Sequence, residues 1–429
     1  MVEKFIIHPG KPLNGAMEVS GAKNAVLPVL AGSLLTAQPC TISNVPNLSD
    51  VESMRELVES LGGNTNWNHK SSSISVDAGN LMKHEAAYEL VGRLRASFLI
   101  VGPLLARLGR ARVPLPGGCA IGSRPVDLHL KGLAALGAKI EHSQGYVEAS
   151  AKKLYGANIY LDFPSVGATE NIMMAAALAD GQTVIENAAI EPEIVDLANF
   201  INTAGGQVRG AGTDTIKITG VKFMNSTQHS IISDRIEAGT FMVAAALTGG
   251  DIILTNVMGD HVKPVTAKLK EVNVQVHETD KGIQVNASES PLVAADIKTL
   301  PYPGFPTDMQ AQFMSLLTKA KGTSIITETV FENRFMQVGE LKRMGADIKI
   351  ESRSAIIKGV DKLTGTNVCA TDLRAGAALV LAALAADNIT EVTGISHIDR
   401  GYCQLDKRLN QLGARIERVK DNIVIPVQK

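Results

Sequence analysis

The sequence lacks an excess of charge of either sign. Its 42 lysines and arginines nearly balance its 43 aspartates and glutamates, and the formal net charge is −1. A protein that binds nucleic acid or an anionic membrane surface through its overall charge needs a basic excess, so we expect neither partner. Any cationic site must therefore be local.

Long apolar runs and cysteine motifs are also missing. The longest apolar run, Ala375 to Ala386, is shorter than the about 20 residues needed to span a bilayer. The N-terminal segment MVEKFIIHPG has no positive region followed by an apolar core, which argues against a secretory signal. The four cysteines have neither metal-ligand nor disulfide-scaffold spacing. We therefore expect a soluble cytoplasmic protein without a bound metal.

What the sequence does contain is one short phrase repeated along its length. An apolar residue is followed by glycine, or once by asparagine, at intervals of about 70 residues. The six positions are Gly62, Gly137, Gly205, Asn273, Gly345 and Gly413. Each follows a predicted amphipathic helix, and these residue types there are typical of the left-handed residue that ends a helix.

An apolar helix rich in small residues is predicted to precede each amphipathic helix. The six apolar helices are expected over Asn24–Leu35, Arg95–Leu108, Ser165–Leu178, Arg235–Leu247, Asp308–Lys319 and Leu373–Leu384. Strand-like segments separate the two helices and two alternating strands follow, so the unit is βαβαββ, six times over. Solenoid repeats are usually about 20–50 residues long, so units of this size favour compact pseudo-threefold domains.

The first residues resemble the end of a repeat. Residues 5–15 match residues 355–365 in spacing, which predicts that the first residues are the tail of a repeat and that the N-terminal strand completes the second domain. We expect two α/β domains of three repeats each, one over residues 22–230 and the other over residues 1–21 and 231–429. The chain would cross between them twice, with residues 225–229 as the second linker.

Charged and polar residues stand at the starts of the apolar helices. Ser165, Asp234 and Asp372 are suited to be ordinary N-caps, and that interpretation stays open beside a functional one. Cations at helix starts oppose the helix dipole, so a repeated set indicates an anion site or ion pairs with neighbouring aspartates. The cations are Lys23, Arg95, Arg235 and Arg374, with Arg124, Arg334 and Arg400 from turn segments. The expected counter-ions of the arginines are Glu193, Glu332 and Asp399.

One thiol, Cys119, follows a Pro-Gly-Gly turn, which favours an exposed loop. By residue type alone, a single cysteine is more often a small buried apolar residue. Its place in the turn segment of the second repeat, near Arg124, instead indicates a reactive thiol with a lowered pKa.

Together these motifs resemble the enolpyruvyl transferase family over essentially the whole chain. The segments concerned are residues 21–24, 95–97, 116–128, 165–169, 187–196, 306–310, 331–335, 372–376 and 397–402. The resemblance implies two inside-out α/β domains joined by a double crossover, and no cofactor. It also implies transfer of the enolpyruvyl group of phosphoenolpyruvate to the 3′-hydroxyl of UDP-N-acetylglucosamine, with release of phosphate, in peptidoglycan synthesis.

The resemblance implies roles for individual residues. Cys119 would protonate phosphoenolpyruvate, form a covalent adduct and react with fosfomycin, while Asp308 would accept the proton of the sugar hydroxyl. Lys23 and Arg400 would assist catalysis. Phosphoenolpyruvate would be held by Lys23, Asn24, Arg124 and Arg400. The nucleotide sugar would contact Asn24, Arg95, Arg124, Pro125, Val126, Asp127, Leu128, Ser165, Val166, Gly167, Asp308 and Val330. Supporting residues would be Glu191, Arg334, Asp372 and Arg374.

Two alternatives stay open. A 3-phosphoshikimate 1-carboxyvinyltransferase shares the fold and the donor, although the cysteine loop and the Arg124–Leu128 segment favour UDP-N-acetylglucosamine as acceptor. A non-catalytic paralogue would bind the nucleotide sugar without chemistry, which the intact Lys23, Cys119 and Asp308 argue against. Some relatives have Lys-Val in place of residues 163–164, so one cationic contact to the diphosphate is missing. Domain closure with the cysteine loop as a lid is a further expectation.

Overall fold

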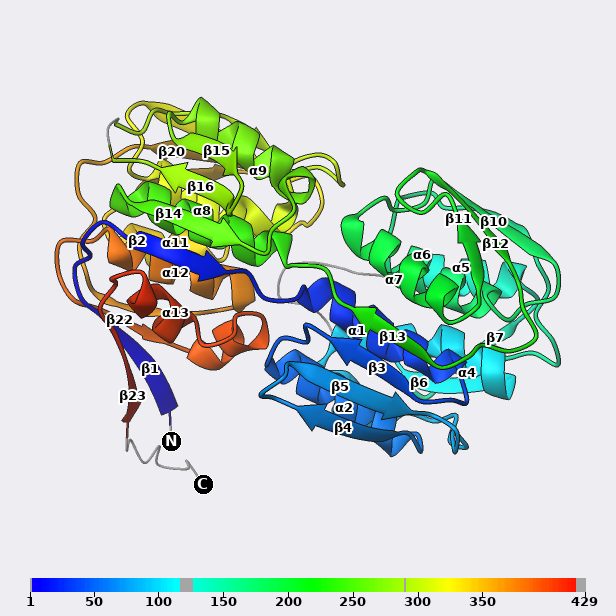
Figure 1. Cartoon of the computed structure of the whole chain (residues 1–429). Coiled ribbons are helices and arrows are strands. Elements are labelled where there is room, and N and C mark those ends of the chain that lie inside the picture. Colours follow the sequence, from blue (N-terminus) through cyan, green and yellow to red (C-terminus); the bar gives the residue numbers. More distant parts are fainter. Residues whose placement is uncertain (1, 116–125, 289–290, 422–429) are drawn as a thin grey trace, which may run out of the picture. The chain divides into compact units, whose positions relative to one another are not determined.

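The structure is a computed structural model that describes residues 2–115, 126–288 and 291–421. The chain divides into two compact units (Figure 1). Among the described residues, the central domain comprises those between Gly21 and Ile232. The terminal domain comprises those up to Ser20 and from Ser233 onward. The chain thus crosses between the domains after Ser20 and after Ile232.

In the described part of the central domain, the strands form three sheets. The strands are β3 (Cys40–Ser43), β4 (Asn64–Asn68), β5 (Ser73–Asp77), β6 (Arg110–Pro114), β7 (Lys139–Ser143), β8 (Tyr146–Ser150), β9 (Asn158–Tyr160), β10 (Gln182–Glu186), β11 (Gln207–Arg209), β12 (Thr215–Thr219) and β13 (Thr227–Ser230). The helices are α1 (Lys23–Gly32), η1 (Ser33–Leu35), α2 (Ser49–Ser60), α3 (Tyr88–Arg93), η2 (Arg95–Ile100), α4 (Val101–Leu108), α5 (Asp127–Ala135), α6 (Val166–Ala176) and α7 (Pro192–Thr203).

The central sheets follow the predicted unit with one shortening. Their strand orders are β13-β3-β5-β4, β6-β8-β7 and β11-β12-β10-β9. In the full sheets the outer strand, β13 or β9, pairs in parallel with its neighbour, and a hairpin adds the other two strands antiparallel. The second repeat has only an isolated parallel bridge, between Glu85 and Arg112, in place of its predicted first strand over the described residues.

The prediction of a linker at residues 225–229 is wrong. Thr227–Ser230 forms β13, which pairs in parallel with β3 and places Thr227 opposite Cys40. This strand completes the sheet of the first repeat, because the chain reaches that repeat without a strand of its own at the start. The polar sequence that resembled a linker is an outer strand of the sheet.

The terminal domain also has three sheets among its described residues. Its strands are β1 (Val2–Ile7), β2 (Asn14–Glu18), β14 (Asp251–Thr255), β15 (Gln275–Thr279), β16 (Gly282–Asn286), β17 (Ile297–Lys298), β18 (Thr323–Thr327), β19 (Asp347–Glu351), β20 (Ser354–Lys358), β21 (Asn367–Cys369), β22 (Thr390–Thr393) and β23 (Ile416–Asp421). Its helices are α8 (Arg235–Thr248), α9 (Gly259–Glu271), η3 (Thr307–Met309), α10 (Gln310–Leu317), α11 (Gln337–Arg343), α12 (Leu373–Leu384), η4 (Ile395–Arg400) and α13 (Leu405–Gln411). The strand orders are β15-β16-β14-β2, β17-β18-β20-β19 and β21-β22-β1-β23.

The N-terminal strand completes the sheet of the last repeat. Strand β1 lies between β22 and β23 and pairs antiparallel with both, so that Phe5 stands opposite Val392 and Arg418. Strand β2 then pairs in parallel with β14 and supplies the outer strand of the fourth repeat. The two ends of the chain are thus joined through one sheet.

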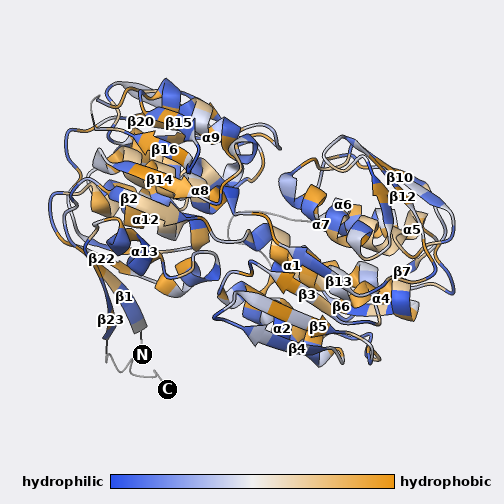
Figure 2. Ribbon diagram, viewed as in Figure 1, coloured by the Kyte–Doolittle hydropathy of each residue, from blue (hydrophilic) through white to orange (hydrophobic). Residues whose placement is uncertain are grey.

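Helices form the centre of the terminal domain. Helices α8, α10 and α12 contact one another, and α12 is buried from Arg374 to Leu384. The ribbon of α12 is mostly in the hydrophobic colours (Figure 2). Alanine and glycine are frequent in α8 and α12, which lets these backbones approach closely while the sheets cover the helices. Packing of buried helices inside outer sheets confirms the inside-out α/β fold. Across the described residues, no helix combines the length and the apolarity that a membrane crossing needs.

The six helix-ending residues have the predicted left-handed conformation. Their φ angles are +107° at Gly62, +97° at Gly137, +95° at Gly205, +71° at Asn273, +90° at Gly345 and +101° at Gly413. Side chains with a β-carbon are strained there, which explains why glycine recurs and why asparagine, which tolerates this region, is the one substitute. The periodic phrase therefore marks the same turn in all six repeats.

Candidate active site

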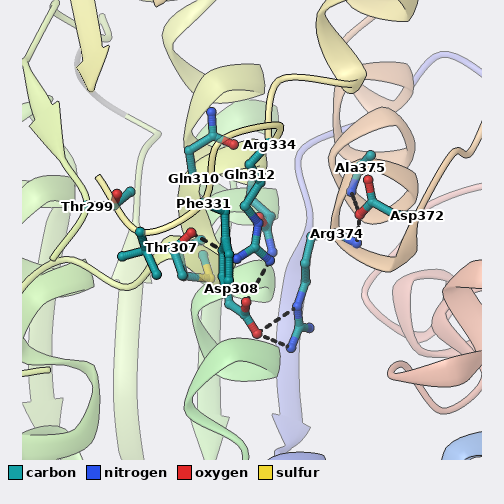
Figure 3. A network of polar contacts seen from close by, with 12 residues as sticks. Thr299, Thr307, Asp308, Gln310, Gln312, Phe331, Arg334, Asp372, Arg374 and Ala375 are labelled. Atoms are coloured by element: carbon teal, nitrogen blue, oxygen red, sulfur yellow. Dashed lines mark hydrogen bonds and ion pairs between the residues drawn. The ribbon is translucent and has the colours of Figure 1, made fainter. Parts of the chain in front are cut away.

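Two arginines hold the carboxylate of Asp308 in the terminal domain (Figure 3). Arg334 Nη2 lies 2.6 Å from Asp308 Oδ1. Arg374 reaches Oδ2 through Nε at 3.2 Å and Nη2 at 2.9 Å. The arginine side chains are only 6% and 5% exposed, whereas Asp308 keeps 25% of its side-chain surface accessible. The two arginines thus fix the carboxylate, and the accessible part of the Asp308 side chain can contact a ligand.

This arrangement keeps Asp308 ionised. Burial alone would raise the pKa of Asp308, but the charges and hydrogen bonds of Arg374 and Arg334 outweigh it and hold that pKa well below its usual range. The carboxylate can therefore accept a hydrogen bond from a neutral hydroxyl at any working pH. It is correspondingly a weak base.

Arg374 is itself oriented by a buried hydroxyl network. Arg374 Nη1 and Gln312 Nε2 lie 3.1 and 3.2 Å from the Tyr402 hydroxyl, and both can only donate to it. Both lone pairs of that oxygen are then used, so its proton points to Thr240 Oγ1 at 2.9 Å. Thr240 donates in turn to the Ile236 carbonyl at 2.8 Å. Helix α8 contributes Thr240 and the Ile236 carbonyl, α10 and α12 contribute one side chain each, and Tyr402 follows η4.

In the central domain, the cation at the start of α1 is paired. Lys23 Nζ lies 2.8 Å from Asp50 Oδ2, and the Asp50 side chain, in the first turn of α2, is only 3% exposed. A buried carboxylate offsets the unfavourable position of a lysine at a helix start. Lys23 therefore takes part in an ion pair, which is one of the two interpretations that the sequence left open. The Asp50 partner was not anticipated.

A histidine that the sequence argument did not single out lies beside the predicted nucleotide-sugar segments. Asn171 Oδ1 accepts from Gly102 N at 2.6 Å, and Asn171 Nδ2 donates to the Phe98 carbonyl at 3.0 Å. The same Nδ2 faces His129 Nδ1 at 3.1 Å, so Nδ1 is the acceptor and the ring proton is on Nε2. Burial, aided by the charge of Arg95, lowers the pKa of His129 to about 4, so the ring is neutral.

His129 brings two predicted segments together. It follows Val126–Leu128 at the start of α5, and its ring lies against Gly167 at the start of α6. A β-carbon on Gly167 would lie 3.1 Å from His129 Cε1, so glycine permits this approach. Two parts of the candidate site that are far apart in sequence are thus neighbours within the central domain.

The N-cap interpretation of three helix starts is confirmed. Ser165 accepts from Ala168 N, and Asp234 and Asp372 each accept from two backbone N–H groups of the helix that follows. Asp399 is an arginine counter-ion as expected, but its partner is Arg418, at 2.6 and 3.0 Å.

The remaining predicted residues divide between the domains. The central domain carries Lys23, Asn24, Arg95, Val126, Asp127, Leu128, Ser165, Val166, Gly167 and Glu191. The terminal domain carries Asp308, Val330, Arg334, Asp372, Arg374 and Arg400. Cys119, Arg124 and Pro125 lie outside the described residues. Helix-start Arg235 has its guanidinium 5.5 Å from the centre of the Tyr302 ring.

Sequence reasoning missed Asp50, His129, Gln312 and Tyr402. One available signal was a polar residue inside an otherwise apolar helix, which applies to Thr240 in α8 and Gln312 in α10. Such residues are buried and must find hydrogen-bond partners, so they mark internal networks. Their partners come from other helices, and no spacing rule along the chain identifies them.

Comparison with known proteins finds relatives that match nearly the whole chain. Residues 7–409 match the family model of EPSP synthase (3-phosphoshikimate 1-carboxyvinyltransferase). UDP-N-acetylglucosamine 1-carboxyvinyltransferase 1 of Caldanaerobacter subterraneus subsp. tengcongensis is 59% identical over 97% of this chain and 100% of its own. UDP-N-acetylglucosamine 1-carboxyvinyltransferase 1 of Halalkalibacterium halodurans is 56% identical over 97% of this chain and 95% of its own.

Solved structures share the fold. The enolpyruvyl transferase NikO from Streptomyces tendae superposes with a TM-score of 0.87 at 25% identity, covering 97% of this chain and 99% of its own. EPSP synthase from Acinetobacter baumannii gives a TM-score of 0.76 at 19% identity, covering 97% and 100% of the two chains, which supports the fold alone. With six repeats, an inside-out fold and a match along nearly its whole length, the chain belongs to the EPSP synthase family.

Proposed function

We propose that this protein transfers the enolpyruvyl group of phosphoenolpyruvate to the 3′-hydroxyl of UDP-N-acetylglucosamine and releases phosphate. The reaction would be the first committed step of peptidoglycan precursor synthesis, in the cytoplasm. The observation that carries the proposal is the 56–59% identity, over nearly full length, to proteins named UDP-N-acetylglucosamine 1-carboxyvinyltransferase. The ionised carboxylate of Asp308 and the fixed ammonium group of Lys23 are chemically suited to this reaction, which supports the proposal.

Addition is the first half of the reaction. The sugar oxygen bonds to C2 of phosphoenolpyruvate, C3 takes a proton from Cys119, and Asp308 receives the hydroxyl proton, which gives a tetrahedral phosphoketal. Because two guanidinium groups hold the pKa of Asp308 low, this carboxylate is too weak a base to remove the proton in advance. Proton transfer to Asp308 therefore accompanies C–O bond formation, when the attacking oxygen becomes positive and its proton acidic.

Elimination completes the transfer. A proton leaves C3, the bond between C2 and the phosphate oxygen breaks, and the enol ether remains on the sugar. Lys23, Arg124 and Arg400 would hold the carboxylate and phosphate of the donor, with Asn24 beside them, since fixed cations suit both groups. In this account, the ion pair with Asp50 fixes the Lys23 side chain at the start of α1.

Residues of each domain are proposed to contact the acceptor. In the central domain it would contact Arg95, residues 124–128 and residues 165–167, with the neutral His129 between the last two segments. In the terminal domain it would contact Asp308 and Val330. Glu191 and Asp372, at the starts of α7 and α12, would support these segments.

Phosphate release with alternative acceptors tests the proposal. The full chain is mixed with phosphoenolpyruvate and either UDP-N-acetylglucosamine or shikimate 3-phosphate, and phosphate is measured. Release with UDP-N-acetylglucosamine alone is expected. Release only with shikimate 3-phosphate would instead assign the 3-phosphoshikimate reaction, and binding of the nucleotide sugar without release in either mixture would indicate a non-catalytic paralogue.

Intact-mass analysis tests the role of Cys119. The proposal predicts a covalent adduct with phosphoenolpyruvate, in which the thiol adds its sulfur to C2 and its proton to C3, and another with fosfomycin, whose epoxide ring the thiolate opens. Cys119→Ser should lose both adducts and keep the circular dichroism spectrum of the parent. Adducts that persist in Cys119→Ser would assign the reactive group elsewhere, with Cys403 and Cys369 as the thiols to examine next.

A further inference from the structure

One buried carboxylate, Glu328, joins the two segments that flank Asp308. The residue is 1% exposed and lies directly after β18. Its Oε1 accepts from Val330 N at 2.8 Å, Phe331 N at 3.1 Å and Thr299 Oγ1 at 2.9 Å. Its Oε2 accepts from Thr307 Oγ1 at 2.8 Å. Glu328 therefore ties the loop that carries Val330 to the segment that precedes α10.

One arm of this cluster leads to Asp308. Because the Thr307 hydroxyl gives its proton to Glu328, its lone pairs face Arg334 Nη1, which donates to it at 2.8 Å. Arg334 then donates through Nη2 to Asp308 (Figure 3). The Phe331 ring also lies 5.2 Å from the Arg334 guanidinium, so the loop and the arginine pack together. The orientation of the Asp308 carboxylate thus depends on Glu328 through two intermediates.

The other arm fixes the Val330 loop. Thr299 Oγ1 accepts from Thr329 N at 2.9 Å, so its own proton goes to Glu328. Thr329 Oγ1 returns a hydrogen bond to the Thr299 carbonyl at 2.5 Å. The backbone N–H groups of Val330 and Phe331 also donate to Glu328. The N–H groups of this loop therefore point toward the buried carboxylate. Val330 itself is half-buried, so part of its side chain stays accessible.

This cluster requires a group that only accepts. An ionised carboxylate accepts at both oxygens, whereas an amide has a donor at one end. If Gln replaced Glu328, its NH2 would face either the two loop N–H groups or the Thr307 hydroxyl, whose proton would then lose its acceptor while Arg334 still donates to the same oxygen. One arm would have to rearrange in either orientation, although the side-chain size is unchanged.

We propose that Glu328 is a positioning residue for the acceptor sugar. Through one arm it places the Val330 loop, and through the other it aims the Asp308 carboxylate at the hydroxyl that reacts. This proposal rests on the proposed function, which assigns Val330 and Asp308 to the same substrate. It predicts that the two arms affect different kinetic constants.

Steady-state kinetics of three variants of the full chain test the proposal. Thr299→Val weakens only the Val330 arm, and KM for UDP-N-acetylglucosamine should rise about tenfold with kcat within a factor of about two, as expected for lost ground-state binding. Thr307→Val weakens only the Asp308 arm, and kcat should fall about tenfold to hundredfold, because misplacement near the reacting groups is costly. Glu328→Gln should show both effects and leave KM for phosphoenolpyruvate within about twofold.

Ser324→Ala is the matched control. Ser324 is buried on β18 in the same sheet and accepts from Ala295 N at 3.1 Å, but it contacts neither arm. A loss of stability without a change in kcat or KM is expected for this variant. Circular dichroism and thermal unfolding of all four variants establish that they fold.

The outcomes separate this proposal from the proposed function. A wild-type chain without phosphate release on UDP-N-acetylglucosamine refutes both. An active wild type whose folded Glu328→Gln variant keeps KM and kcat within about twofold refutes the positioning role alone. Equal loss of kcat in Glu328→Gln and Ser324→Ala would also refute it, because the effect would then be a general loss of packing.

Discussion

The Tyr402 hydroxyl makes the most direct prediction about stability. Tyr402→Phe keeps the ring and removes one oxygen that accepts from Arg374 and Gln312 and donates to Thr240, all of them buried. Loss of the hydrogen bond from Arg374 should cost the most stability, because a charged donor would then face an apolar carbon of the phenylalanine ring. We expect the terminal domain to lose stability without losing its fold.

The magnitude follows from the partners. A hydrogen bond to a charged group contributes about 1.5–3 kcal/mol and a neutral one about 1 kcal/mol. Thr240 and Gln312 keep their mutual contact at 3.2 Å, and Thr240 keeps the Ile236 carbonyl, so the three losses do not add in full. The free energy of unfolding should therefore fall by about 2–3 kcal/mol. For a domain of about 150–250 residues this lowers Tm by about 4–12 °C.

Differential scanning calorimetry of the full chain measures this shift. Tyr302→Phe is the control, since the Tyr302 hydroxyl makes an exposed hydrogen bond of 3.4 Å to the Asp260 carbonyl. That variant should change stability by less than about 0.5 kcal/mol. A loss below that same limit for Tyr402→Phe would show that the hydroxyl network contributes no net stability and that Arg374 is oriented by Asp308 alone.

Three further predictions concern other sites. Lys23→Met should cost about 3–5 kcal/mol in urea unfolding, because the buried Asp50 loses its ammonium partner; a change below about 1 kcal/mol would mean the pair is solvated. Gly339→Ala, inside α11 with open space around it, should stabilise by about 0.5–1 kcal/mol, whereas Gly345→Ala, equally open but at φ +90°, should destabilise by about 1–2 kcal/mol; equal signs would contradict the backbone argument. Burial, with Glu193 and Glu191, raises the pKa of Glu170 well above its usual range, so the native state keeps a proton that the unfolded chain releases above about pH 4. Stability of the parent should then fall as pH rises above about 4, and the stability of Glu170→Gln relative to the parent should rise with it; a pH-independent difference would refute this.

Local rules account for much of what was predictable. The helix-ending glycines were identifiable because a left-handed residue restricts the choice of side chain at that one position, whatever surrounds it. The starts of the apolar helices followed from their caps, as at Asp234 and Asp372. The likeness of residues 5–15 to residues 355–365 indicated that the N-terminal strand belongs to a repeat, since equivalent strands need equivalent patterns, and the structure showed that this repeat is the last one.

The sequence by itself thus determined six equivalent turns, six apolar helices and a list of charged residues near the helix starts. Only the tertiary structure decided which charges meet. Arg374 reaches Asp308 from another repeat and Arg334 from a turn segment later in the same repeat, and Asp50 reaches Lys23 from the next helix. The same holds for β13, whose polar residues resemble a linker until β3 supplies its partner. Caps and turns are set by neighbouring residues, whereas ion pairs and outer strands are set by which helices and sheets pack together.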